Sequence, residues 1–205
     1  IIDIDQIYVI KDLHNGNEIN NKMNWIDSVG HHPNDYDIIM TEDIGKKWFP
    51  TSISVEYAEE YSNYIHKNYK NPIIMWPNHC INDTSGFNII PSIQVTLNDW
   101  EKISNKKVII IEKGFNKYSE QYGILPEGRF PIVMSDKDIK NSINEFINIL
   151  TTYSKITIMG DDFSHSFLSI YRDILEILYD WLKIDVNYLP NIIINNNTTY
   201  NFEYE

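Results

Sequence analysis

The chain is poor in cysteine, in basic side chains and in long apolar runs. One cysteine among 205 residues excludes an internal disulfide framework and favours a reducing compartment, so the cytoplasm is the expected location. Lys and Arg number 17 against 29 Asp and Glu, a net charge of -12, which argues against nucleic acid or an anionic membrane as a partner. No apolar run reaches the length of a membrane span, and no signal-peptide pattern is visible. These absences indicate a globular protein whose partner is a small molecule or another protein.

Short apolar segments alternate with longer segments of helical period, which predicts an α/β protein with a mainly parallel sheet. The apolar segments lack polar alternation, as expected of strands covered by helices on both faces. No repeat or linker divides the chain, so one domain is expected over residues 1–205. The predicted strands are 1–10, 36–41, 107–112, 155–159, 185–189 and 191–194, and helical patterns cover 55–69, 136–153 and 167–182.

Residues 76–86 combine several special-purpose side chains in one segment. Their sequence is Trp-Pro-Asn-His-Cys-Ile-Asn-Asp-Thr-Ser-Gly. It contains a large aromatic side chain, a proline that makes a turn rigid, a histidine next to a cysteine, and a second turn. By itself such a segment can be a packed surface corner. It lies, however, within the irregular stretch 48–94, and in α/β folds binding sites are built on loops at the carboxyl ends of strands.

Three polar residues stand at the ends of predicted strands. Asp3 interrupts an apolar strand, where a buried carboxylate is costly unless it is paired or functional. Lys113 closes the run Val-Ile-Ile-Ile-Glu-Lys, and Ser166 lies at a turn from a strand into a helix, where backbone N–H groups can stabilise an oxyanion. Taken singly, Asp3 or its neighbour Asp5 reads as a surface carboxylate, Lys113 as a solvated lysine and Ser166 as a helix cap.

Residues 76–86 fill every fixed position of the segment Trp-Pro-x-His-Cys-x-x-x-Thr-x-Gly of nicotinamidases, and the chain resembles that family. Nicotinamidases belong to the isochorismatase-like cysteine hydrolases, whose Asp, Lys and Cys triad corresponds in order to Asp3, Lys113 and Ser166. The resemblance implies a three-layer, Rossmann-like fold. It also implies an amide hydrolase that converts nicotinamide, a small aromatic carboxamide, to nicotinic acid and ammonia.

The same resemblance assigns substrate-binding and metal-binding residues. Tyr8, Trp76 and Tyr122 match aromatic positions of the family, and stacking on a flat ring is the role that this implies. Asp43 and His79 match two of the positions that bind zinc in nicotinamidases. The resemblance therefore predicts a zinc site formed by Asp43, His79 and a further ligand.

Two positions depart from the family pattern. Ser166 stands where the nucleophilic cysteine is expected, and a serine hydroxyl is far harder to deprotonate than a thiol. Gly45 stands where the family has the second zinc-binding histidine, which leaves the metal site one ligand short. Impaired hydrolysis is therefore expected. The alternative is an inactive relative that binds a small molecule or a protein, and whether the chain forms a homo-oligomer is left open.

Overall fold

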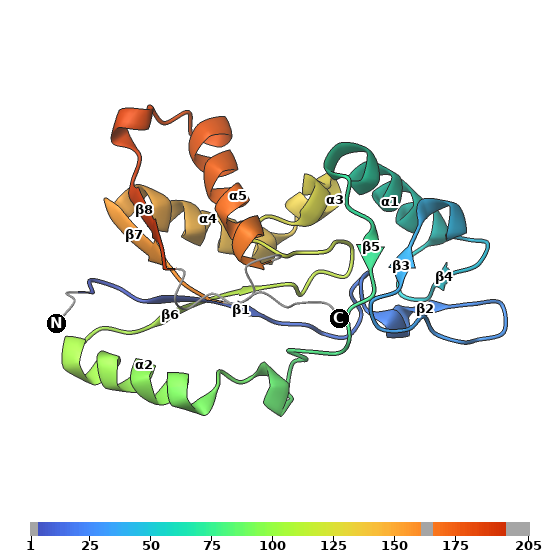
Figure 1. The fold of residues 1–205 in the computed structure, drawn as a ribbon, viewed down its shortest axis with the longest axis horizontal. Coiled ribbons are helices and arrows are strands. Elements are labelled where there is room, and N and C mark those ends of the chain that lie inside the picture. The colour runs from blue at the N-terminus through green and yellow to red at the C-terminus, as the bar shows by residue number, and fades with distance from the viewer. Residues whose placement is uncertain (1–3, 161–165, 196–205) are drawn as a thin grey trace. The chain divides into compact units, whose positions relative to one another are not determined.

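The computed structural model describes residues 4–160 and 166–195. The chain divides into two units, Ile1–Glu120 and Gln121–Glu205, in which helices and strands alternate (Figure 1). This confirms the α/β class. Among the described residues, no helix combines the length and the apolar character needed to cross a membrane.

A pair of parallel strands organises the first unit. β1 (Tyr8–Asp12) pairs with β6 (Ile109–Lys113), in a register that sets Asp12 opposite Lys113. Figure 1 shows the two strands running side by side. The sequence placed the first strand at 1–10, whereas β1 begins only at Tyr8 and continues to Asp12, because pairing with β6 holds even its polar last residues in extended conformation.

Helix α1 (Val55–Tyr69) follows directly from its sequence. Ser54 caps it by accepting the backbone N–H of Tyr57, and it ends at Lys70, whose φ is +60°. Its buried residues recur at helical spacing, so one face of the helix covers the core. That face consists of Ala58, Tyr61, Ser62 and Ile65.

The rest of the first unit consists of short elements around an apolar core. Trp25, Ile39, Ile73 and Met75 are fully buried, and each such side chain stabilises the fold by about 1.5–3 kcal/mol. The indole N–H of Trp25 donates to the carbonyl of Ile19 at 2.7 Å. Two short antiparallel pairs belong to this unit: β2 (Trp25–Ile26) with β4 (Phe49–Pro50), and β3 (Ile38–Ile39) with β5 (Ile73–Ile74). Its other helical elements are α2 (Pro91–Ser104) and the 3₁₀ turns Lys22–Asn24, Thr41–Asp43 and Ser85–Phe87.

The second unit contains helices at both places where the sequence predicts them in the carboxyl-terminal half, 136–153 and 167–182. Asp136 caps α4 (Lys137–Thr152), and α5 (Leu168–Leu175) continues as a π-helical segment, Glu176–Trp181. β7 (Lys155–Ile158) and β8 (Asn191–Ile194) form a second parallel pair. The remaining helices are Glu127–Arg129 and α3 (Pro131–Met134).

The strand predicted at 185–189 is wrong. The segment forms a 3₁₀ turn, Val186–Tyr188, because the carboxylate of Asp185 accepts the backbone N–H of Asn187 at 2.9 Å. A side chain that bonds to its own backbone two residues ahead favours a turn over an extended strand.

Candidate functional site

A charged pair lies at the carboxyl end of β1 and β6. Lys113 Nζ is 2.5 Å from Asp12 Oδ1, and the exposed fractions of the two side chains are 4% and 26%. Parallel strands end at the same edge of a sheet, so the strand register itself brings the two groups together. A nearly buried ammonium group beside a carboxylate is the arrangement expected of a site that orients and polarises a bound molecule.

This pair differs from the one expected from the sequence. Lys113 is the predicted residue, but Asp3 lies outside the described residues. Asp5, the alternative, has a side chain that is 84% exposed and pairs with Lys106 at the surface. The carboxylate that the structure places beside Lys113 is that of Asp12.

The loop 76–86 is hydrogen-bonded along the segment that follows β1. His14 donates its backbone N–H to the carbonyl of Cys80 at 3.0 Å, and Asn82 donates to the carbonyl of His14 at 2.8 Å. Further along, the N–H of Trp76 donates to Asn20. These bonds bring His79 next to His14, with their ring centroids 4.7 Å apart.

Backbone carbonyls set the tautomers of both histidines. His14 Nδ1 is 2.8 Å from the carbonyl oxygen of Gly114, and His79 Nδ1 is 2.7 Å from that of Pro77. Because a carbonyl oxygen only accepts, each Nδ1 carries the hydrogen and each Nε2 of the neutral ring keeps its lone pair. Burial lowers the pKa of His14, although Asp12 opposes the shift, so its ring is neutral near pH 7.

Asp12, His14 and His79 together form a group that could hold a metal ion. One ligand atom from each residue lies within 4.8 Å of the other two. Two neutral imidazoles and a carboxylate are a donor set that suits zinc and related transition metals. Within residues 4–160 and 166–195, no other cluster of three His, Cys, Asp or Glu side chains has this geometry.

Asp43, the predicted metal partner of His79, is not in this group. It ends the 3₁₀ turn Thr41–Asp43 and is half-buried. Gly45, two residues on, has φ +74°, and a Cβ there would lie 2.9 Å from Val55 Cγ1. A histidine at position 45 would therefore be strained. This turn does not supply the zinc-binding histidine that the family has at that position.

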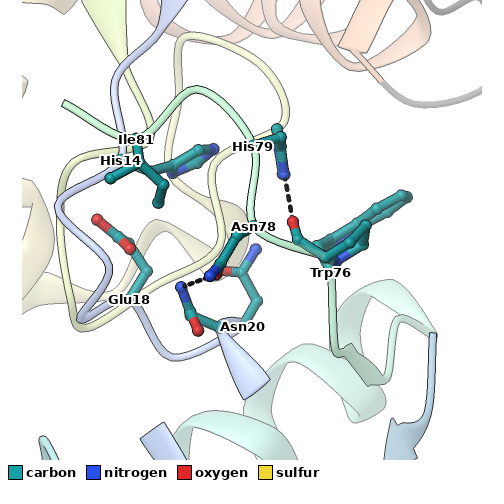
Figure 2. A pocket seen from close by; sticks show the side chains of 9 residues that line it. His14, Glu18, Asn20, Trp76, Asn78, His79 and Ile81 are labelled. Atoms are coloured by element: carbon teal, nitrogen blue, oxygen red, sulfur yellow. Dashed lines mark hydrogen bonds between the residues drawn. The ribbon is translucent and has the colours of Figure 1, made fainter. Parts of the chain in front are cut away.

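The pocket beside the two histidines is small (Figure 2). The space that the centre of a water molecule can occupy in this pocket is about 10 Å³. The pocket therefore has room for one water molecule or ion. Glu18 forms part of the wall, and its carboxylate accepts the backbone N–H groups of Asn15 and Gly16. Figure 2 shows His14 and His79 next to each other, with Trp76 beyond His79.

Comparison with solved structures finds two nicotinamidases. A yeast nicotinamidase bound to the inhibitor nicotinaldehyde is 14% identical, with a TM-score of 0.50 over 93% of this chain and 80% of that one. A nicotinamidase/pyrazinamidase from Acinetobacter baumannii is 12% identical, with a TM-score of 0.51 over 98% of this chain and 69% of that one. The chain has the fold of the nicotinamidases. No protein-family model matches the sequence, and the search of curated proteins finds no match.

Within this nicotinamidase fold, the predicted aromatic residues lie in different places. Trp76 is half-buried at the pocket edge, and its ring meets that of His79 at a centroid distance of 6.5 Å. Tyr8 begins β1, at the end of the strand opposite to Asp12. Tyr122 is half-buried in the second unit. Trp76 alone of the three lines the pocket, and the ligand-binding role of each remains a prediction.

The two candidate nucleophiles differ in their surroundings. Ser166 is half-buried just before α5 in the second unit, and its catalytic role remains a prediction. Cys80, the chain's one cysteine, is half-buried in the loop 76–86. Burial, followed by the charge of Asp12, raises the pKa of the Cys80 thiol, and Lys113 opposes this shift only in part. Cys80 is therefore mainly the neutral thiol near pH 7.

The sequence contains a signal for Asp12 and His14, two site residues that were not predicted. Asp12 and His14 form an Asp-x-His pair, which is a ligand pattern of the nicotinamidase zinc site. The predicted first strand, 1–10, does not include Asp12, and Asp3 was predicted as its functional carboxylate. The strand bounds, which depend on pairing with β6, show that Asp12 closes β1.

Proposed function

We propose that this chain is an amide hydrolase of the nicotinamidase type, acting slowly on the C–N bond of a small aromatic carboxamide such as nicotinamide. The pair of Asp12 and Lys113, beside the loop that carries Trp76 and His79, is the observation that carries this proposal. The nicotinamidase fold supports it, and the two proteins of similar structure are nicotinamidases.

Asp12 and Lys113 have complementary roles in this proposal. The Asp12 carboxylate acts first as a general base and then as a general acid for the leaving ammonia. The Lys113 ammonium group orients that carboxylate and polarises the substrate. Because the Lys113 side chain is only 4% exposed, water screens its charge weakly, and its effect on a bound carboxamide is correspondingly large.

Ser166 is the proposed nucleophile and the reason for slow turnover. Its Oγ attacks the carboxamide carbon, the C–N bond breaks, ammonia leaves, and water then hydrolyses the resulting ester. A serine hydroxyl needs a stronger base than a cysteine thiol does, and an aspartate is a weak one. Replacing the serine by cysteine is therefore expected to speed the reaction.

Zinc is the proposed cofactor, and Trp76 the proposed stacking surface. Asp12, His14 and His79 would hold the metal, which would supply Lewis-acid chemistry toward a polar atom of the substrate. The indole of Trp76 lies at the pocket edge, where it can stack on a flat ring. The His79 ring belongs to the same loop, so metal and aromatic contacts would act on one ligand.

Ammonia release from nicotinamide tests the proposal. Asp12→Asn and Lys113→Met are expected to lower kcat/KM at least about 100-fold, since each removes a group that handles protons or charge. Ser166→Ala is expected to abolish release, and Ser166→Cys to raise it. Asp5→Asn, which removes an exposed carboxylate that pairs with Lys106, is the matched control and is expected to retain wild-type activity.

A binding module is the second candidate, favoured by the serine at position 166 and by the neutral thiol of Cys80. It predicts that nicotinamide binds, as measured by calorimetry, without ammonia release. If both the wild type and Ser166→Cys bind nicotinamide but release no ammonia, the hydrolase proposal is wrong and the binding module stands. Release that Ser166→Ala abolishes rejects the binding module.

A further inference from the structure

The segment 123–129 packs directly against helix α5. Gly123 has no side chain, and a Cβ at its position would lie 3.1 Å from the backbone carbonyl carbon of Ser169 and would overlap the carboxyl group of Asp173. The backbone N–H of Leu125 donates to Asp173 Oδ2 at 2.9 Å. The main chain of the segment therefore lies against the first two turns of α5.

Two arginine side chains join this segment and α5 in opposite directions. Arg129, in the segment, donates from Nη2 to Asp173 Oδ1 at 2.8 Å and to Glu176 Oε2 at 2.7 Å. Its Nε donates to the other oxygen of Glu176 at 3.2 Å. Arg172, in the helix, donates from Nη2 to Glu127 Oε1 of the segment at 2.6 Å. Charged hydrogen bonds in both directions thus resist sliding of the segment along the helix.

The backbone of Arg129 depends on these contacts for its conformation. Its φ is +50°, in the left-handed region that residues with a Cβ seldom adopt, and it follows Gly128, whose φ is +77°. Its Nη1 donates to the carbonyl of Pro126 at 2.9 Å within the same turn. The side chain is only 11% exposed, so water screens its bonds to α5 less than those of a surface ion pair. The planar guanidinium group therefore fixes a strained turn against the helix.

The two joined elements both lead to predicted site residues. Tyr122 directly precedes the segment 123–129. Ser166 precedes Ser169 by three residues, which is about one helical turn. A shift of the segment relative to α5 would therefore move Tyr122 relative to Ser166. A displacement of about 1 Å between the groups of an active site can cost about 100-fold in rate.

We infer that Arg129 is a positioning residue that fixes Tyr122 relative to Ser166. It acts by holding the segment 123–129 against α5 rather than by contact with the substrate. All the contacts that carry this inference lie within the second unit. The consequence for hydrolysis rests on the proposed function, whereas the fixed distance between the two positions does not.

Cross-linking of two introduced thiols tests the fixed distance without any substrate. The chain carries Tyr122→Cys and Ser166→Cys, together with Cys80→Ser to remove its own cysteine, and a short bifunctional thiol reagent joins the two positions within one molecule. Adding Arg129→Met is expected to slow this reaction at least about fivefold, because the two thiols lose their fixed orientation, while circular dichroism checks the fold. Lys140→Met, which removes an exposed lysine from α4 of the same unit, is the matched control and is expected to leave the rate unchanged.

Ammonia release from nicotinamide tests the consequence for the reaction in the chain that keeps its tyrosine and serine. Arg129→Met is expected to lower kcat about tenfold or more and to change KM less than about threefold, because the pocket that Trp76 lines is unchanged. Arg129→Lys keeps the charge but lacks the planar fork that bonds two acids, so it is expected to recover only part of kcat. An arginine with a purely structural role would change the fraction of folded chain and leave kcat per folded molecule at the wild-type value.

The two measurements separate the ways in which the inference can fail. Cross-linking that is absent in the parent, or equally fast with Arg129→Met, would overturn it, and so would a wild-type kcat in folded Arg129→Met. If Arg129→Met slows cross-linking but neither the wild type nor Ser166→Cys releases ammonia, the hydrolase proposal is wrong and the fixed distance stands. If Arg129→Met does not fold, Glu176→Gln removes one charge from the same contact at a side chain that is 24% exposed, and the same expectations apply to it.

Discussion

One buried carboxyl group, that of Asp173, is expected to stabilise the folded protein less as the pH rises from 5 to 8. Arg129 Nη2 lies 2.8 Å from Asp173 Oδ1 and 2.7 Å from Glu176 Oε2, and Arg172 Nη2 lies 2.6 Å from Glu127 Oε1. The cluster thus holds three carboxyl groups and two guanidinium groups. Asp173 is fully buried, and burial favours the neutral, protonated form of a carboxyl group.

The magnitude follows from the pKa of Asp173. Burial, opposed by the charge of Arg129, raises this pKa to about 7, against about 3.9 in an unfolded chain. The folded state therefore holds a proton that the unfolded state releases. The associated stability is fully present below about pH 4 and is lost as the pH rises through 7. Between pH 5 and pH 8 the loss is about 2–3 kcal/mol.

Asp173→Asn isolates this contribution, since the amide keeps the shape and does not titrate. Urea unfolding at pH 5 and pH 8 should show that the stability of the wild type relative to Asp173→Asn shrinks by about 2–3 kcal/mol at the higher pH. Asp180→Asn, at an exposed position of the same helical segment, controls for the loss of one charge. A gap that is constant, or that widens with pH, would show that Asp173 is ionised and stabilised by Arg129, and would refute this reasoning.

Two further predictions concern Gly123 and Cys80. Gly123→Ala is expected to lower Tm by roughly 2–12 °C, because its Cβ would lie 2.0 Å from Asp173 Oδ2, which also accepts the N–H of Leu125. Gly86→Ala is the control, since a Cβ at position 86 would have no neighbour closer than 3.6 Å. If both variants lost the same Tm in a thermal melt, the packing argument would be wrong. The Cys80 thiol is expected to react with a disulfide reagent more slowly at pH 7 than a free cysteine, since its pKa is raised. A rate equal to that of free cysteine, measured by thiolate release, would show that the pKa of Cys80 is not raised.

Local patterns in the sequence were sufficient for much of the fold. The spacing of apolar residues predicted α1, α4 and the helix that begins with α5. Such features depend on residues within a few positions of one another. The helix α2 was missed, and only Leu97 of its residues is buried, so its sequence carries a weak core-facing pattern.

The α/β class and the likeness to nicotinamidases follow from the sequence alone, which also predicts that Lys113 and the segment 76–86 belong to a site. Which carboxylate faces Lys113 follows from the fold, because it depends on the register of β1 against β6, two strands far apart in the chain. The fold also brings His14 to His79 through backbone hydrogen bonds between distant segments. Periodicity and turn chemistry are local, whereas a site built from several segments depends on which backbone groups pair across the fold.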